Sequence, residues 1–90
     1  MLRIEFTSQF KKDYQKAIKR GCDPQKFVEV VTMLQQQLTL PAEYRDHKLQ
    51  GKYSNYRECH ISPDWLLIYR VKKEILTLVL TRTGSHSDLF

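Results

Sequence analysis

A chain of 90 residues can build one hydrophobic core but not a deep cleft between two lobes, so we expect a single domain over residues 1–90 with an open binding surface. Its net charge of +5 favours a polyanionic partner, and 41% hydrophobic residues with only three glycines and three prolines argue against disorder. No apolar run approaches the roughly 18 residues of a membrane-spanning helix, and the first residues do not form a signal peptide. These features predict a cytoplasmic protein with no membrane partner.

The first 40 residues predict one strand and two helices. Apolar and charged residues alternate over residues 2–6, which is the period of a strand with one buried face. Either of the two hydroxyl residues that follow can cap a first helix, which Gly21 ends. Asp23 and Pro24 suit the N-cap and the first turn of a second helix. We therefore expect a helical hairpin at about residues 8–39.

The second half of the chain predicts three strands. Residues 41–51 show no period and read as a loop that carries His47, whereas residues 53–61, 65–71 and 75–81 are rich in β-forming side chains. The short connections between these three runs allow only antiparallel neighbours. The order β-α-α-β-β-β predicts an α+β fold, with the helical hairpin packed on one face of a small antiparallel sheet and the other face free.

Four polar residues are expected to gather at one end of this sheet. His60 and Asp64 flank the turn between the second and third strands, and Arg82 and His86 follow the fourth. Because antiparallel strands reverse at each turn, the end of the fourth strand returns to the turn that contains Asp64. The strand assignment therefore predicts that these four side chains converge.

Two imidazoles, a carboxylate and a guanidinium are sufficient for general acid–base cleavage of a phosphodiester. One group removes the proton of a nucleophilic 2′-hydroxyl, a second protonates the leaving 5′-oxygen, and Arg82 stabilises the charge that grows on phosphorus. RNA supplies this nucleophile and DNA does not. Trp65 and Phe90 are candidates for stacking on the bases of single-stranded RNA.

Each of these residues also has a structural explanation. A histidine in a small domain is more often a surface or hydrogen-bonded residue than a catalyst. Trp65 suits a core position at the start of its strand, and Phe90 could anchor the end of the chain on the sheet. Arg82 could pair with an acidic neighbour. Clustering of the histidines in the second half of the chain favours the functional interpretation more than any single residue does.

A metal site is the chemical alternative, because three histidines and an aspartate could ligate zinc. No pair of them has the i, i+4 interval of a helical site or the spacing of a tight ligand loop. Cys22 and Cys59 are far apart without a C-x-x-C spacing, so we expect two reduced thiols. We therefore predict no metal and no small-molecule cofactor.

Four phrases in the second half resemble the YafQ branch of the RelE/ParE toxin superfamily. The similarity covers the whole chain, including its length and its basic charge. The phrases are Asp46-His47-Lys48-Leu49-Gln50-Gly51, Tyr56-Arg57-Glu58-Cys59-His60-Ile61, Pro63-Asp64-Trp65-Leu66-Leu67-Ile68-Tyr69 and Arg82-Thr83-Gly84-Ser85-His86-Ser87-Asp88-Leu89-Phe90.

This resemblance implies a ribosome-dependent endoribonuclease, the toxin half of a type II toxin–antitoxin pair, which cuts mRNA in the ribosomal A site. Its partners would be the 70S ribosome, mRNA and a cognate acidic antitoxin. The residues that match the family's active site are His47, His60, Asp64, Arg82, His86 and Phe90, with Trp65 beside them.

Two other classes of protein remain as alternatives at this point. ParE-type toxins of the same superfamily inhibit a protein target such as DNA gyrase without catalysis, and they lack the set of histidines. A plain nucleic-acid-binding module would explain the charge but not the histidines. An RNA-cleavage assay separates both from an endoribonuclease.

Overall fold

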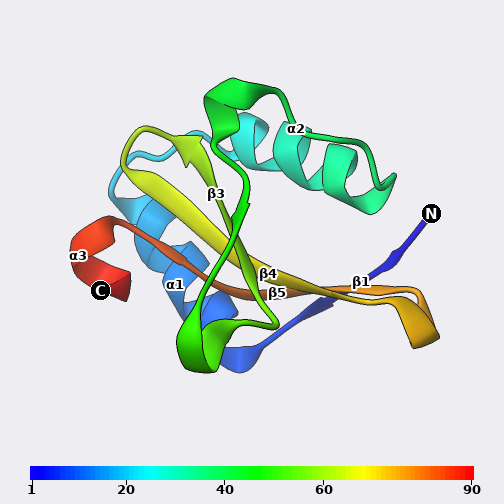
Figure 1. Cartoon of the computed structure of the whole chain (residues 1–90). Coiled ribbons are helices and arrows are strands. Elements are labelled where there is room, and N and C mark those ends of the chain that lie inside the picture. The colour runs from blue at the N-terminus through cyan, green and yellow to red at the C-terminus, as the bar shows by residue number, and fades with distance from the viewer.

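Five strands form one sheet in the order β1-β5-β4-β3-β2 in the computed structural model, which describes residues 1–90 (Figure 1). Two twelve-residue helices follow the first strand, and a short third helix ends the chain. The elements are β1 (Arg3–Phe6), α1 (Ser8–Lys19), α2 (Pro24–Gln35), β2 (His47–Lys48), β3 (Arg57–Ser62), β4 (Trp65–Lys72), β5 (Thr77–Gly84) and α3 (His86–Leu89). Neither long helix has the length and apolar content that crossing a bilayer requires.

The two long helices begin and end with the capping residues that the sequence predicts. The Thr7 hydroxyl accepts the N–H of Phe10 at the start of α1, and the Asp23 carboxylate accepts the N–H of Gln25 at the start of α2. Gly21 has φ +96°, the left-handed conformation that ends α1. Helix α2 ends at Gln35, before the expected end at about residue 39. Two residues later, Gln37 adopts a left-handed conformation with φ 59°.

The sheet is mixed rather than wholly antiparallel. Strands β3, β4 and β5 pair as antiparallel neighbours, as their short connections predict. Strand β1 instead pairs in parallel with β5, with Arg3 opposite Thr77 and Phe6 opposite Leu80. Almost the whole chain separates these two strands, so no short turn restricts their relative direction. The expected loop over residues 41–51 also contains the two residues of β2, which pair with β3.

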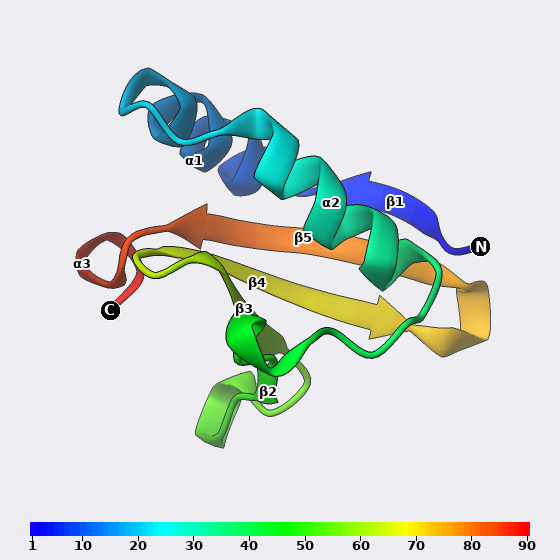
Figure 2. The ribbon, with the colours of Figure 1, turned by 90° about the horizontal axis from the view of Figure 1, so that it is seen from above.

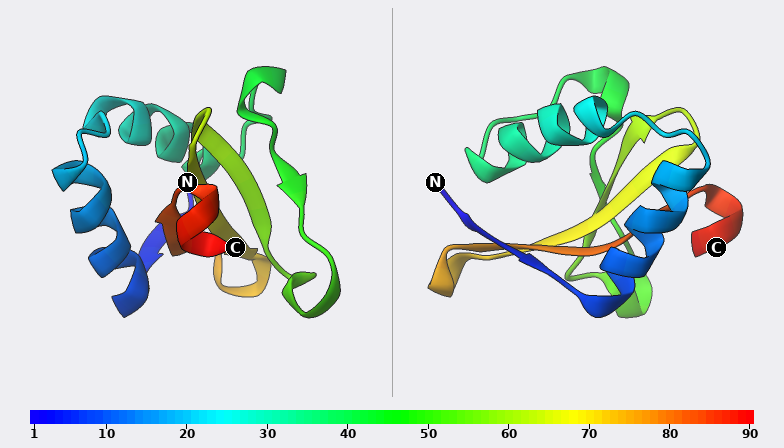
Figure 3. Two further views of the ribbon diagram at one scale, coloured as in Figure 1. Left: turned by 90° about the vertical axis from the view of Figure 1, so that its left-hand side faces the viewer. Right: turned by 180° about the vertical axis from the view of Figure 1, so that it is seen from behind.

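Helices α1 and α2 cover the same face of the sheet, as the sequence predicts (Figures 2 and 3). The side chains that alternate along the strands toward this face are buried with the apolar residues of the helices. They include Phe10, Val30, Leu34, Cys59, Leu67, Tyr69, Leu78 and Leu80. This α+β architecture, with a helical hairpin on one face, confirms the predicted fold class.

The opposite face is only partly free. Leu66 and Ile68 point away from the helices, because strand residues alternate between faces, yet both are buried. Leu49, Tyr53 and Phe90 line a cavity with Ile68, so the segment after β2 and the end of the chain cover part of this face. The remaining exposed part is where the polar residues of interest lie.

Candidate active site

His60, Asp64 and His86 come together at one end of the sheet. The ring centres of the two histidines are 5.8 Å apart, and Nδ1 of His86 lies 3.8 Å from Oδ1 of Asp64. The same carboxylate oxygen accepts the backbone N–H of His86 at 3.3 Å. Asp64 and His86 are exposed and His60 is half-buried, so an incoming strand can reach all three. The structure therefore brings together three of the four side chains that were expected to converge, whereas Arg82 pairs with Asp13 of α1.

The short helix α3 positions His86. Ser85 caps it, because the Ser85 hydroxyl accepts the N–H of Asp88 while the Asp88 carboxylate accepts the N–H of Ser85. Arg20, the C-cap residue of α1, donates to the same carboxylate from two nitrogens, at 2.5 and 3.2 Å. A Cβ on Gly84 would lie only 2.9 Å from the Cβ of Asp88, so glycine permits this close approach. These contacts attach the end of the chain to α1.

Arg82 reaches the exposed face through a bulge in β5. Tyr69 pairs with Leu80 and Ile68 pairs with Arg82, so Thr81 is an extra residue in the strand. The insertion reverses the alternation and puts Arg82 on the same face as Ile68. Its guanidinium then donates from Nε and Nη2 to the carboxylate of Asp13 on α1, at 3.0 and 3.1 Å.

Asp13 also closes a gap in the sheet edge. Strand β1 pairs only with the first half of β5, so the N–H of Thr83 has no neighbouring strand, and Asp13 accepts it at 3.2 Å. Burial alone raises the pKa of Asp13, but the hydrogen bonds from Arg82, Gln9 and Thr83 outweigh it and hold the pKa below its usual value. The same ion pair raises the pKa of Arg82, which stays cationic.

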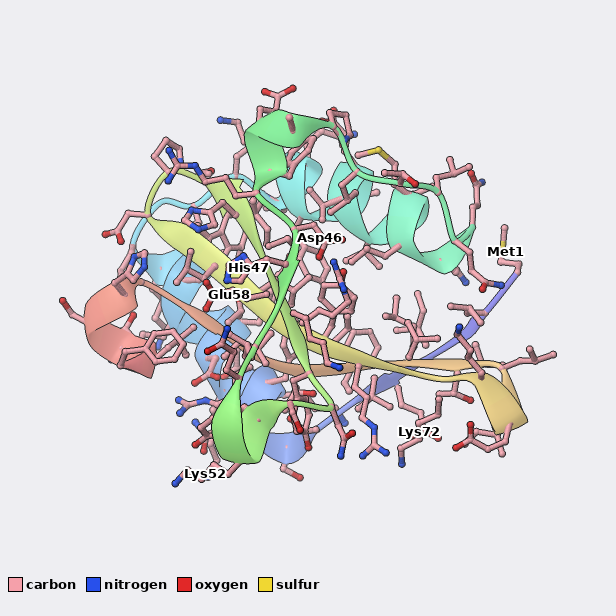
Figure 4. All side chains as sticks on the ribbon, viewed as in Figure 1. Met1, Asp46, His47, Lys52, Glu58 and Lys72 are labelled. Carbon is pink, nitrogen blue, oxygen red and sulfur yellow. The ribbon has the colours of Figure 1, made fainter.

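His47 lies on the exposed side of β2, opposite Glu58 in β3 (Figure 4). Its Nδ1 lies 2.7 Å from the carbonyl oxygen of Arg45, which can only accept, so Nδ1 carries the hydrogen. Nε2 then faces Oε1 of Glu58 at 3.5 Å. Glu58 is 4% exposed, and its Oε2 has no hydrogen-bond partner. A buried carboxylate next to an exposed imidazole can fix the orientation of that imidazole.

Phe90 forms one wall of a cavity of about 110 Å³ beside Arg82. The Phe90 ring is 69% exposed and its centre lies 6.3 Å from that of His86. Tyr53 and Tyr56 also line this cavity. An exposed aromatic ring next to a guanidinium and an imidazole is suited to hold a base while its phosphate meets the cationic groups.

The structure corrects the prediction for Trp65. Its side chain is only 2% exposed, and its ring packs 6.3 Å from Phe27 in the core beneath α2. Trp65 points to the helical face because it alternates with Leu66, which points to the other face. A buried ring cannot stack on an incoming base, so Trp65 is a core residue rather than part of the RNA-binding surface.

A comparison with protein families matches residues 2–90 to the model of the "bacterial toxin of type II toxin-antitoxin system, YafQ". The chain belongs to the YafQ family. It is 43% identical over 88 residues to the mRNA interferase toxin YafQ of Escherichia coli K12, an alignment that covers 97% of this chain and 94% of the relative. None of these matches supports the ParE-like alternative.

Solved structures of YafQ-type toxins have the same fold. A metal-bound toxin from Helicobacter pylori is 44% identical and superposes with a TM-score of 0.94, with both chains covered completely. YafQ in the E. coli DinJ–YafQ complex is 42% identical, with a TM-score of 0.89 over 100% of this chain and 99% of the other. The agreement extends over every element that builds the site.

No three histidine, cysteine, aspartate or glutamate side chains of this YafQ-family chain lie close enough together to hold a metal ion. His60 and His86 form a pair and Asp64 approaches only His86, so these three side chains do not form a closed ligand set. Both cysteines are free thiols. Burial raises the pKa of Cys59, which makes that thiol a poor nucleophile.

Two residues of the candidate site were missed by reasoning from the sequence. Asp13 lies 69 positions before Arg82, and nothing in the pattern of α1 distinguishes it from other polar residues on that helix. Glu58 had a detectable signal, because it lies two residues before His60 in β3 and so shares its face. Its burial next to His47 follows from the pairing of β2 with β3, which the sequence did not predict.

Proposed function

We propose that this toxin is an endoribonuclease of the mRNA interferase type that cuts mRNA in the ribosomal A site without a metal ion. The contacts among His60, Asp64 and His86 are the observation that carries the proposal, because they supply two proton-transfer groups on an open surface. The 43% identity to the mRNA interferase YafQ of E. coli supports it independently. Acting on translating ribosomes, the toxin works in the cytoplasm.

The reaction needs one group that removes a proton and one that supplies a proton. Of His60 and His86, one takes the proton from the 2′-hydroxyl, and the 2′-oxygen forms a bond to the adjacent phosphorus. The bond from phosphorus to the 5′-oxygen breaks, and the other imidazole protonates the leaving oxygen. Asp64 orients His86 through the contact at 3.8 Å. One fragment then carries a 2′,3′-cyclic phosphate, which can open to a 3′-phosphate, and the other a 5′-hydroxyl.

Arg82 stabilises the negative charge that grows on the phosphoryl oxygens. Asp13 engages only Nε and Nη2 of its guanidinium, so Nη1 keeps its N–H groups for the substrate. Phe90 stacks on a neighbouring base and so holds the strand in register. His47 lies on the same face in β2, where the carbonyl oxygen of Arg45 and the carboxylate of Glu58 face its two ring nitrogens and fix the orientation of the imidazole.

Dependence on the ribosome follows from the openness of this surface. Asp64 and His86 are both more than half exposed, and the cavity beside Phe90 is small, so the protein offers few groups that position a flexible strand. A ribosome that holds the mRNA codon in one conformation supplies this missing orientation. We therefore expect cleavage in programmed ribosomes and weak cleavage of free RNA.

A cognate acidic antitoxin neutralises the toxin. The E. coli relative forms a complex with DinJ, and the charge of +5 here gives an acidic protein a complementary surface. A segment of the antitoxin that folds on binding would cover a larger area than a rigid domain of equal size.

The test replaces the 2′-hydroxyl of the scissile nucleotide by 2′-deoxy or 2′-methoxy in mRNA bound to programmed ribosomes. Cleavage should disappear, whereas the same change at a neighbouring nucleotide should leave it intact. Unmodified mRNA should give a fragment with a cyclic or 3′-phosphate and a fragment with a 5′-hydroxyl. Undiminished cleavage of the modified substrate would falsify attack by the 2′-hydroxyl and favour a water- or metal-activated route.

A further inference from the structure

A second cavity, of about 210 Å³, lies between α1 and the end of β5, and Arg82 lines both this cavity and the one beside Phe90. We propose that it binds a backbone phosphate of the RNA strand that is cut. The inference rests on the proposed function, because it assigns a further contact to the same substrate. Four cationic side chains and two carboxylates line the cavity, namely Lys12, Lys16, Arg20, Arg82, Asp13 and Asp88.

The two carboxylates of this cavity are already saturated with donors. Asp13 accepts hydrogen bonds from Arg82, Gln9 and the N–H of Thr83. Asp88 accepts hydrogen bonds from both terminal nitrogens of Arg20 and from the N–H of Ser85. The oxygens of both carboxylates are therefore already occupied by donors of the protein. Four positive and two negative side chains leave the cavity with a net charge of +2.

Donors remain free for an anion. Lys12 makes no ion pair, and Lys16 only approaches Asp88, at 3.5 Å with 61% of its side chain exposed. Nη1 of Arg82 has no partner, because Asp13 takes Nε and Nη2. These three groups come from one helix and one strand and border the same space. A phosphodiester group carries one negative charge and several acceptor oxygens, which fits this set of donors.

The spacing of the cations also favours a polyanion over a single small anion. Lys12 and Lys16 on α1 and Arg20 at its C-cap follow one another at intervals of four residues, so they lie on one face with a rise of about 6 Å between neighbours. Like charges at this interval repel one another and destabilise a helix. A strand with regularly spaced phosphates offsets that repulsion.

Arg82 makes the cut strand the expected occupant of this cavity, rather than ribosomal RNA. Its side chain borders both this cavity and the one lined by Phe90. A strand with one base on Phe90 and its scissile phosphate near His86 would therefore pass over Arg82 into the cavity along α1. The cavity thus acts as a phosphate subsite next to the position of cleavage.

The first experiment compares two variants with the same loss of charge. Lys12→Gln/Lys16→Gln removes two lysines from the cavity, and Lys72→Gln/Lys73→Gln removes two from the far end of the sheet (Figure 4). Both are made in an inactive His86→Ala background, and their folding is checked by circular dichroism and thermal melting. The affinity for a short single-stranded RNA is measured against salt concentration.

The cavity variant should lower the slope of log K against log salt by about 0.7 for each phosphate contact that it loses, whereas the control should keep the slope of its parent. Equal slopes for the two variants would overturn the subsite, because general attraction to a basic protein would then explain the binding. Single phosphates of the RNA can also be replaced by neutral methylphosphonate. At one position this replacement should weaken binding to the parent protein as much as the two lysine substitutions do, and it should not weaken binding to the cavity variant any further.

The same variants, with and without the His86→Ala change, distinguish the cut strand from ribosomal RNA as the occupant, and phosphate binding from cleavage. If the cavity variant weakens binding to programmed ribosomes but not to free RNA, the occupant is ribosomal RNA and the assignment to the cut strand is wrong. A wild-type protein that binds RNA through the cavity but never cleaves mRNA would overturn the proposed function and leave the phosphate site intact.

Discussion

Asp13 links the stability of this toxin to the position of Arg82, the arginine to which we assign a catalytic role. Its carboxylate accepts two hydrogen bonds from Arg82, one from the N–H of Thr83 and one from Gln9. Asp13→Ala removes all four, while Asp13→Asn keeps an oxygen that can accept the N–H of Thr83 but loses the charge. The alanine variant should therefore be clearly less stable than the asparagine variant.

The loss of stability can be worked out from the contacts of Asp13. Leaving the part-buried N–H of Thr83 without an acceptor costs about 1–3 kcal/mol. The ion pair adds about 0.2–1 kcal/mol, because solvent screens an arginine that is 37% exposed. The alanine variant should thus lose about 2 kcal/mol of unfolding free energy, which lowers Tm by roughly 8–16 °C in a domain of this size. The asparagine variant should lose about half as much.

The loss of unfolding free energy in Asp13→Ala should also depend on pH, and it should be smaller in acid. Hydrogen bonds from Arg82, Gln9 and Thr83 hold the folded-state pKa of Asp13 below that of the unfolded chain, despite the opposing effect of burial. The stability that Asp13 contributes is therefore complete above the unfolded pKa, about 3.9, and is lost as the pH falls through the lower folded value. The gap in stability between wild type and Asp13→Ala should narrow over that acidic range.

Urea denaturation followed by circular dichroism at several pH values measures this gap. Glu29→Ala is the control, since Glu29 is an exposed carboxylate of α2 that makes no hydrogen bond or ion pair. The mRNA interferase activity of Asp13→Ala should fall as well, because Arg82 is no longer held on the exposed face. Equal stability of Asp13→Ala, Glu29→Ala and wild type at neutral pH, or a gap that persists unchanged in acid, would refute the reasoning.

Two further predictions concern the active site and the support beneath it. His86→Ala should abolish growth arrest, because a general acid–base group contributes about 10²–10⁴ in rate, while circular dichroism should show an unchanged fold in a variant of an exposed residue. Full toxicity of that variant would remove His86 from the site. Tyr69→Phe deletes the buried hydroxyl that donates to Asp46 at 2.5 Å, and it should lower the unfolding free energy by about 1.5–3 kcal/mol. An unchanged urea midpoint would show that this hydrogen bond contributes nothing.

The elements that depend on neighbouring residues could be predicted from the sequence. Thr7, Gly21 and Asp23 bound the helices because caps and left-handed turns are decided within a few residues. The antiparallel order of β3, β4 and β5 followed from short connections. That order was enough to predict that His60, Asp64 and His86 would meet, because it puts the relevant turn and the end of β5 together.

Only the tertiary structure decided the features that depend on distant parts of the chain. Strand β1 pairs in parallel with β5, and Asp13 meets Arg82, across sequence separations that no local period reports. The bulge at Thr81 and the burial of Trp65 depend on which face of the sheet the helices cover. A shift of one residue along a strand moves a side chain to the opposite face, so only the assembled sheet determines that Arg82 lies on the exposed face and Trp65 in the core.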